Sequence, residues 1–303
     1  MENKLCFVQF IHPGGEHYPD NARFKSWNTE SHERKFMKNK GKYLSEGSIC
    51  EGDIMFWGEW ESESKVIKFI NEPVIDRPNY IYEPYYETPP SYEGLQNTDP
   101  FVFGKQFHYT GCQQNTKKGP TQLRNLDVGS VVLFGSCIGK KHFVLDALFV
   151  VSHWIDHNKY NYKDVLKNEI SDVYTDVVIK PWYQASALGC GPKKIGVEES
   201  YRLYYGATYH NKISGMFSFF PCLPFHKELK GFARPEIAIP NIITNNLSQG
   251  KRLNPQANLD QVKKLWTEVT KQVVDHGLKL GIYAELPEKK NMVNSIFDKK
   301  SEN

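Results

Sequence analysis

Two glutamates beside two tryptophans are the strongest candidates for chemistry in the sequence. They stand in residues 57–61, Trp-Gly-Glu-Trp-Glu, at the end of an apolar run. In an extended strand Trp57, Glu59 and Glu61 face one side, and Trp60 faces the other. A carboxylate beside an indole loses solvation, so its pKa rises toward the range of a general acid or base. We therefore predict Glu59 and Glu61 as catalytic, with the tryptophans stacking on a ring of the substrate. The alternative is a strand leaving the core, whose glutamates meet water or nearby lysines.

A turn with two histidines follows the first apolar strand. Residues 12–17 are His-Pro-Gly-Gly-Glu-His, and imidazoles beside a carboxylate can shuttle protons or contact a substrate. A plain tight turn is the favoured interpretation, and His12 and His17 are kept as substrate-binding candidates. The spacing matches no closed metal site, so neither a metal nor another cofactor is predicted.

A third segment, residues 108–114, places Cys112 near a histidine. Such a pair suggests nucleophilic catalysis, but sequence neighbours rarely form one, and no third orienting group is visible. A small buried apolar cysteine is the favoured interpretation. The amide of Gln113 can bind a base edge, and aromatic rings can stack on one. The predicted substrate-binding set therefore also includes Gln113, Tyr109, Tyr85 and Tyr86.

Basic residues gather in two stretches, although the net charge is only +3. Residues 34–42 hold five lysines and arginines and no acid, and residues 100–126 hold four and no acid. Basic stretches near aromatic residues fit a groove that follows a nucleic-acid backbone, and a solvated surface is the alternative. The predicted phosphate contacts are Arg34, Lys35, Lys38, Lys117 and Lys118.

The elements that must position these residues are mostly strands. Apolar runs predict strands at 5–11, 52–61, 66–70, 129–136, 143–151 and 173–179, and a strand pair at 201–209 and 215–220. Residues 29–42 look helical, and the proline- and tyrosine-rich stretch 71–100 predicts a long ordered loop rather than sheet. The clearest helix spans the apolar stripe of residues 262–273, with Asn258 as N-cap, Gln261 three residues later and Gly277 as stop.

The predicted fold class is α+β: a β-rich core with a mixed or barrel-like sheet, a basic N-terminal segment and a C-terminal amphipathic helix. One domain over 1–285 is expected, with two sub-lobes divided within 71–100 as the alternative, and 286–303 as a polar tail. Six cysteines without a CxxC pair favour reduced thiols and a cytoplasmic location. No stretch approaches 18 apolar residues, so no membrane span is expected.

Gly52-Asp53 and Gly129-Ser130 each open an apolar strand with a second glycine six positions after the first. This arrangement resembles small β-barrel modules of the PUA and EVE type, and the resemblance implies binding to RNA or modified bases. Our first interpretation is a nucleic-acid- or nucleotide-directed enzyme, a hydrolase of the glycosylase type that cleaves an N-glycosidic bond. The alternatives are a non-catalytic reader of DNA or RNA, and a module that binds a small molecule or a protein.

Overall fold

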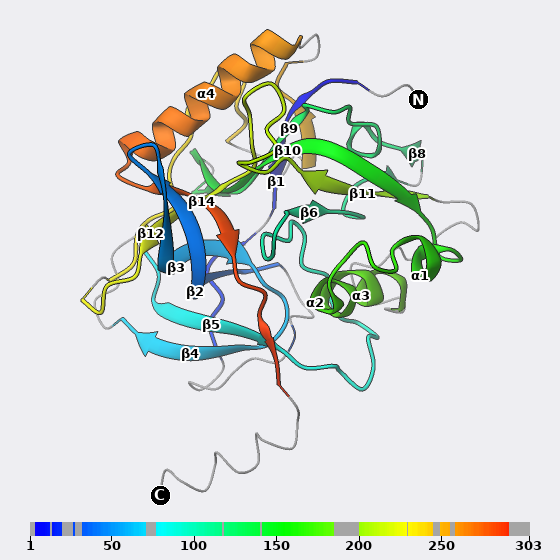
Figure 1. Cartoon of the computed structure of the whole chain (residues 1–303), viewed down its shortest axis with the longest axis horizontal. Coiled ribbons are helices and arrows are strands. Elements are labelled where there is room, and N and C mark those ends of the chain that lie inside the picture. The colour runs from blue at the N-terminus through cyan, green and yellow to red at the C-terminus, as the bar shows by residue number, and fades with distance from the viewer. Residues whose placement is uncertain are drawn as a thin grey trace, which may run out of the picture.

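Two large β-sheets, one two-stranded sheet and a few helices make up the described part of the fold, as predicted for the α+β class (Figure 1). Among the described residues no helix has the length and apolar character needed to cross a membrane. The computed structural model describes residues 4–12, 14–19, 27, 32–70, 77–116, 118–139, 141–184, 200–228, 230–244, 249–254 and 258–290.

The first sheet has six strands in the order β13-β1-β9-β10-β11-β6. β1 and β9 run parallel, and the other neighbours are antiparallel. A register shift between Leu145 and Ala147 makes Asp146 an extra residue in β10, a β-bulge that re-aims its side chain. The strands are β13 (Gln249–Arg252), β1 (Phe7–Ile11), β9 (Val131–Ile138), β10 (His142–His157), β11 (Tyr201–Gly206) and β6 (His108–Tyr109).

The second sheet follows the order β14-β12-β3-β2-β5-β15, and β4 pairs with β5. Because β14 also pairs with β2, the strands β2, β3, β12 and β14 close into a ring, which confirms the predicted barrel-like sheet. Gly281 leaves room in this ring, since a Cβ there would collide with Phe220. The strands are β14 (Lys279–Ala284), β12 (Phe220–Pro224), β3 (Ser48–Glu59), β2 (Arg34–Ser45), β5 (Tyr80–Tyr86), β15 (Glu288–Lys289) and β4 (Ser64–Phe69).

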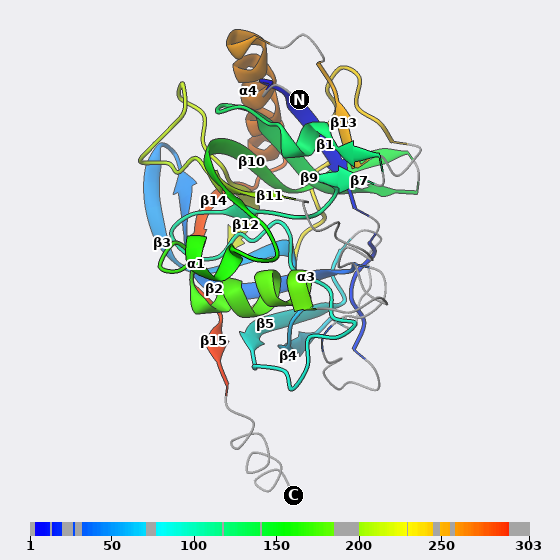
Figure 2. The same cartoon turned by 90° about the vertical axis from the view of Figure 1, so that its right-hand side faces the viewer.

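Helices cover the sheets at two places. The predicted C-terminal helix is confirmed as α4 (Leu259–Asp275), with a capping box between Asn258 and Gln261 and a left-handed Gly277 after its end. In both Figure 1 and Figure 2, α2 and α3 lie between β11 and β5. The remaining short elements are α1 (Tyr162–Val165), α2 (Asp172–Tyr174), η3 (Thr175–Ile179), α3 (Lys180–Gln184), η2 (Gln122–Arg124), β7 (Asn115–Thr116) and β8 (Gly119–Pro120).

The structure corrects four predicted elements. Residues 34–42 belong to β2 instead of a helix, because both edges of this basic segment are paired. Residues 173–179 are helical instead of a strand, since a fully buried apolar run has no periodicity to separate the two. The loop predicted over 71–100 contains β5, and the expected strand pair at 201–220 is absent because β11 and β12 lie in different sheets.

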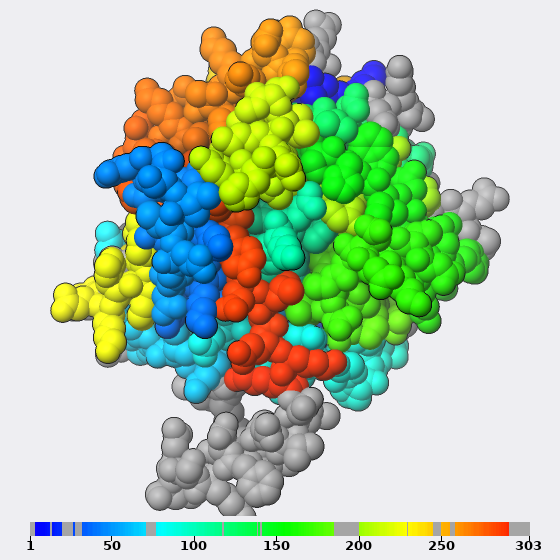
Figure 3. Space-filling view, viewed as in Figure 1, coloured from blue at the N-terminus to red at the C-terminus, as the bar shows by residue number. Residues whose placement is uncertain are grey.

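The C-terminal part of the described chain lies between the hairpin of β2 and β3 and the helical region. In Figure 3 the red segment from β14 to β15 runs between the blue hairpin of β2 and β3 and the green helical region. β15 adds to β5 in parallel, through Glu288 opposite Tyr85 and Lys289 opposite Tyr86. The second sheet therefore contains residues from both ends of the sequence.

Candidate functional site

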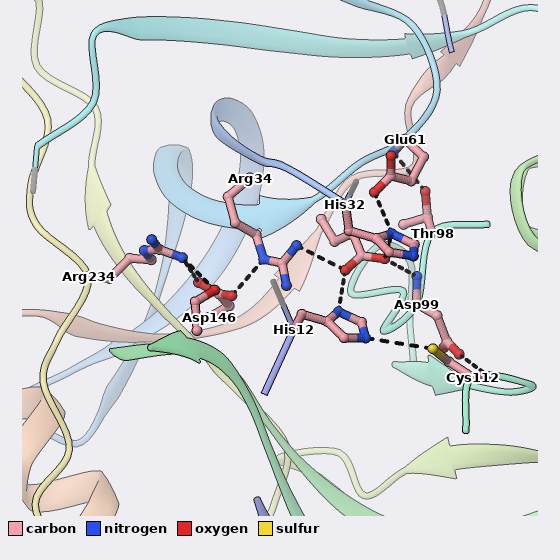
Figure 4. Close-up of polar contacts among 11 residues, drawn as sticks. His12, His32, Arg34, Glu61, Thr98, Asp99, Cys112, Asp146 and Arg234 are labelled. Carbon is pink, nitrogen blue, oxygen red and sulfur yellow. Dashed lines mark hydrogen bonds and ion pairs between the residues drawn. The ribbon is translucent and has the colours of Figure 1, made fainter. Parts of the chain in front are cut away.

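A cluster of buried polar side chains lies where the two sheets meet (Figure 4). His12 follows the end of β1, Arg34 begins β2, Glu59 ends β3, and Asp146 comes from the bulge of β10. Most members are below 10% exposed, which is unusual for charged groups and marks a candidate functional site. We call this set the buried cluster; it comprises His12, His32, Arg34, Glu59, Glu61, Asp99, Cys112, Asp146 and Arg234.

Glu59 lies at the centre of the buried cluster, and both of its oxygens have partners. Oε2 lies 2.7 Å from His12 Nδ1 and 3.1 Å from an Arg34 Nη1. Oε1 lies 3.2 Å from His32 Nδ1 and accepts the Asp99 backbone N–H at 3.1 Å. Burial alone would raise the pKa of Glu59, but His12, His32 and Arg34 outweigh it and hold the pKa well below its usual range. Glu59 is therefore an ionised, fixed acceptor.

Glu61 has a different environment. Its Oε1 lies 2.8 Å from His32 Nδ1, and its backbone N–H donates to Thr98 Oγ1 at 3.0 Å. Its Oε2 is buried and has no hydrogen-bond partner within the described residues. Burial raises the pKa of Glu61, with His32 and Lys35 opposing the shift. A buried oxygen without a partner is costly, so this oxygen is suited to receive a ligand atom or a proton.

Cys112 reaches the buried cluster from a tight turn after β6. Its Sγ lies 3.7 Å from His12 Nε2, and the side chain is half-buried. Gly111 has φ +80° and its Cβ position is filled by the Trp182 ring, so only glycine fits there. Tyr109 Oη donates to the Cys112 carbonyl at 2.6 Å. This turn presents the sulfur to His12 in a fixed position.

The two ring nitrogens of His12 have distinct roles. Burial lowers the pKa of His12, and Glu59 opposes that shift. Because the ionised Glu59 only accepts hydrogen bonds, we assign the proton of neutral His12 to Nδ1. The lone pair of Nε2 then faces the Cys112 thiol, which is the orientation that a base needs to accept the thiol proton.

Two further carboxylates complete the electrostatics. Asp146 accepts from Arg34 Nε at 2.7 Å and from Arg234 Nη1 at 3.3 Å, so two guanidiniums share it. Asp99 accepts the backbone N–H groups of Thr110 at 3.1 Å and of Cys112 at 3.4 Å. Burial raises the pKa of Asp99 well above its usual range despite these hydrogen bonds. Asp99 links the Cys112 turn to Glu59, because its carboxylate accepts from that turn and its backbone N–H donates to Glu59.

The structure brings the predicted pair Glu59 and Glu61 together with His12 and Arg34, which come from separate segments of the sequence. Arg34 and Lys35 are both enclosed by protein, so their charges act internally and not along a surface groove. Lys35 Nζ donates to the Ser62 carbonyl at 2.7 Å, and burial lowers its pKa to about 8.

The other predicted residues lie outside the centre of the buried cluster. Trp57 and Trp60 are buried, and each indole N–H donates to a backbone carbonyl. His17 is buried against Glu33, while Tyr109 is buried under the Cys112 turn. Gln113 and Lys118 are exposed, and Lys38 pairs with Asp53. The rings of Tyr86 and Tyr85 are covered by Lys289 and Lys290, respectively. Lys117 lies outside the described residues.

Sequence reasoning missed His32, Asp99, Asp146 and Arg234. One signal was available: Asp146 is the only charged residue in the apolar run 143–151, and a buried charge needs a partner. The contact between Cys112 and His12 joins residues 100 positions apart, so no local pattern indicated it.

His32, Glu59 and Glu61 could also hold a metal ion, because one ligand atom from each lies within 4.8 Å of the others. Comparison with known proteins offers no guide to the site: no family model, no curated protein and no solved structure matches the chain.

Proposed function

We propose that the buried cluster is the active site of an enzyme in which Cys112 is the nucleophile, His12 its base and Glu59 the group that orients His12. One observation carries the proposal: Cys112 Sγ lies 3.7 Å from His12 Nε2, and His12 Nδ1 lies 2.7 Å from Glu59 Oε2. Nucleophile, base and orienting acid in this order are the arrangement that activates a weak nucleophile in unrelated folds.

The chemistry follows from the two nitrogens of His12. Nε2 accepts the thiol proton as sulfur forms a bond to an electrophilic carbon of the substrate. The same proton then passes to the leaving group as the bond between that group and the carbon breaks. Water, deprotonated by His12, releases the second product from sulfur, or another acceptor takes its place. The reaction class is therefore hydrolysis or group transfer through a covalent thiol intermediate.

The substrate class in this proposal is a nucleobase-containing molecule that carries phosphate. Arg124 and Arg202 both contact the carboxylate of Asp156, at 3.1 Å and 3.0 Å, so two guanidiniums lie close together here. Gln114, two residues beyond Cys112, bonds to the backbone of Arg202 in both directions. Arginine is the preferred partner of phosphate groups. A cytoplasmic location belongs to the same proposal, because Cys112 must stay reduced, and the five cysteines in the described part of the chain form no disulfide with one another.

A product screen tests the proposal. Nucleosides, nucleotides and short DNA and RNA are incubated with the wild type and with Cys112→Ser, and the products are separated by liquid chromatography with mass detection. We expect turnover by the wild type and by the control Cys137→Ser, which changes another half-buried thiol, and none by Cys112→Ser. Equal turnover by Cys112→Ser would refute the role of the thiol. Binding without any turnover would favour the non-catalytic reader.

A second candidate is N-glycosidic cleavage that uses Glu61. The observation that favours it is the buried Glu61 Oε2 without a partner, since cleavage needs a carboxylate with an oxygen available to the reacting groups. Glu59 is less suited to this role because both its oxygens are occupied. In the same screen this candidate predicts free base as product, full activity in Cys112→Ser, and loss of activity in Glu61→Gln.

A further inference from the structure

We propose that His32, Glu59 and Glu61 bind one divalent transition-metal ion at the Oε1 side of Glu59, next to the His12 ring on which His32 stacks at a centroid distance of 5.2 Å. Each residue contributes one ligand atom: His32 a ring nitrogen, and each glutamate one carboxylate oxygen. Glu59 Oε2 remains bonded to His12 and Arg34, so the metal uses Oε1. The site adds to the proposed thiol chemistry and is separable from it, because no step of that chemistry depends on the ion.

The distances fit a common ion. His32 Nδ1 lies 2.8 Å from Glu61 Oε1 and 3.2 Å from Glu59 Oε1. Two ligand atoms bound to one tetrahedral zinc at about 2.1 Å each lie about 3.4 Å apart. The two distances from His32 Nδ1 are therefore within about 0.6 Å of this spacing, and the ligand atoms of all three residues lie within 4.8 Å of one another. All three side chains are buried, so the ion would be enclosed by protein.

The unpartnered Glu61 oxygen supports the site independently. Oε2 belongs to the carboxylate whose Oε1 contacts His32, and it is buried without a hydrogen-bond partner among the described residues. Buried polar atoms in native proteins nearly always have a partner, and a bound ion is one established partner for an atom that has none within the protein. A carboxylate that binds an ion through one or both oxygens removes this anomaly.

The charges of the buried cluster point to the same ligand. Four carboxylates, those of Glu59, Glu61, Asp99 and Asp146, face the two guanidiniums of Arg34 and Arg234. Lys35, whose charge interacts with Glu61, adds one further positive group. Uncompensated charge inside a protein is costly. With all four carboxylates ionised, the set holds one more negative than positive group, so its surroundings attract a cation.

The ligand atoms indicate which ions fit. Imidazole nitrogen suits zinc, iron and similar ions, whereas carboxylate oxygen also suits manganese. Magnesium prefers oxygen ligands and retains its waters, so it should bind more weakly here. Three protein ligands leave at least one coordination position for water or substrate, which is typical of catalytic rather than structural sites.

Calorimetric titration of the full chain tests the site. The protein is stripped with a chelator, dialysed and titrated with Mn²⁺, because thiolates of the free cysteines compete little for this hard ion. We expect one Mn²⁺ per chain, a metal-dependent rise in Tm, and weaker binding of Mg²⁺. Glu61→Gln and His32→Gln should each bind Mn²⁺ at least about 100-fold more weakly, since even second-shell changes cost 10–100-fold.

The matched control is His142→Gln. His142 pairs with Glu236 at 2.6 Å on the surface and would account for adventitious binding by an exposed histidine and carboxylate. Folded wild-type protein that binds no Mn²⁺, or binding that survives both Glu61→Gln and His32→Gln, would overturn the proposal. If Glu61→Gln does not fold by circular dichroism, His32→Gln and the wild-type stoichiometry decide.

Cys112→Ser separates this site from the proposed function. It should bind Mn²⁺ with unchanged affinity, because Cys112 contacts His12 and is not among the three ligands. Metal binding together with full turnover by Cys112→Ser would retain the metal site and refute the thiol mechanism. Loss of Mn²⁺ binding in Cys112→Ser would instead overturn the ligand set proposed here.

Discussion

Replacing Asp146 by asparagine should destabilise the protein strongly, because it leaves a buried guanidinium without its main counter-charge. Asp146 accepts from Arg34 at 2.7 Å and from Arg234 at 3.3 Å, and its side chain is 5% exposed. Removing one partner of a buried ion pair typically costs about 3–5 kcal/mol. At about 2.1 cal/mol/K of unfolding entropy per residue, a loss of about 4 kcal/mol lowers the Tm of this 303-residue chain by about 6 °C.

The assay is urea unfolding followed by tryptophan fluorescence, with the Tm measured by calorimetry. The matched control is Glu51→Gln, which breaks the exposed pair between Lys42 and Glu51 at 3.0 Å. Such surface pairs contribute about 0–1 kcal/mol, so this control should unfold like the wild type. In Asp146→Asn with Arg34→Gln, part of the loss should return, because both charges of the Arg34–Asp146 pair are gone while Arg234 still lacks its partner.

Two results would refute the reasoning. If Asp146→Asn were no less stable than Glu51→Gln, the Asp146 carboxylate would not be a buried partner of Arg34. If the loss of unfolding free energy in the double variant equalled the sum of the losses in the two single variants, Arg34 and Asp146 would not be coupled. Either result would remove the argument that the buried cluster is a preorganised charge network.

The other predictions concern single features of the fold. Burial lowers the pKa of both His108 and His157 to about 3, below an unfolded value near 6.5, so the unfolded chain binds protons first and stability should fall as the pH drops below 6.5. At pH 5 the expected loss is about 2 kcal/mol for each histidine; urea unfolding at pH 7.5 and 5 measures it, and an unchanged pH dependence in His108→Gln with His157→Gln would contradict it. Gly111→Ala should lower the Tm and misplace Cys112, because its Cβ would lie 2.7 Å from the Trp182 ring at φ +80°; a Tm equal to that of Gly47→Ala, where nothing is within reach, would show that the turn is not constrained by contact. Tyr109→Phe removes the 2.6 Å hydrogen bond to the Cys112 carbonyl and should cost about 1–2 kcal/mol in urea unfolding; no loss would mean that this bond does not hold the turn.

The sequence predicted those helices and strands whose capping residues or apolar pattern lie within a single stretch of the chain. The capping residues Asn258 and Gln261 predicted the start of α4, and the glycine-bounded apolar run predicted the strand that ends at Glu59. The same patterns placed Glu59 and His12 at strand ends, where side chains from different strands can meet. These predictions depended only on the chemistry of neighbouring residues.

Features set by tertiary pairing could not be predicted in this way. β2 carries lysines because its outward face is solvated, and its partners on both edges determine that it is a strand. The Cys112–His12 contact depends on the register of β6 and β1 within one sheet, at a separation of 100 residues. The bulge that aims Asp146 at Arg34 becomes visible only when β9 and β10 are paired.

The rate at which iodoacetamide alkylates Cys112 tests the central claim most directly. Peptide mass spectrometry follows Cys112 and Cys137, which are both half-buried, in the same sample. An adjacent base should make Cys112 react at least about tenfold faster than Cys137. In folded His12→Gln this advantage should disappear, while the rate at Cys137 stays unchanged. Equal rates in the wild type, or an advantage that survives His12→Gln, would contradict the proposal that His12 activates the Cys112 thiol.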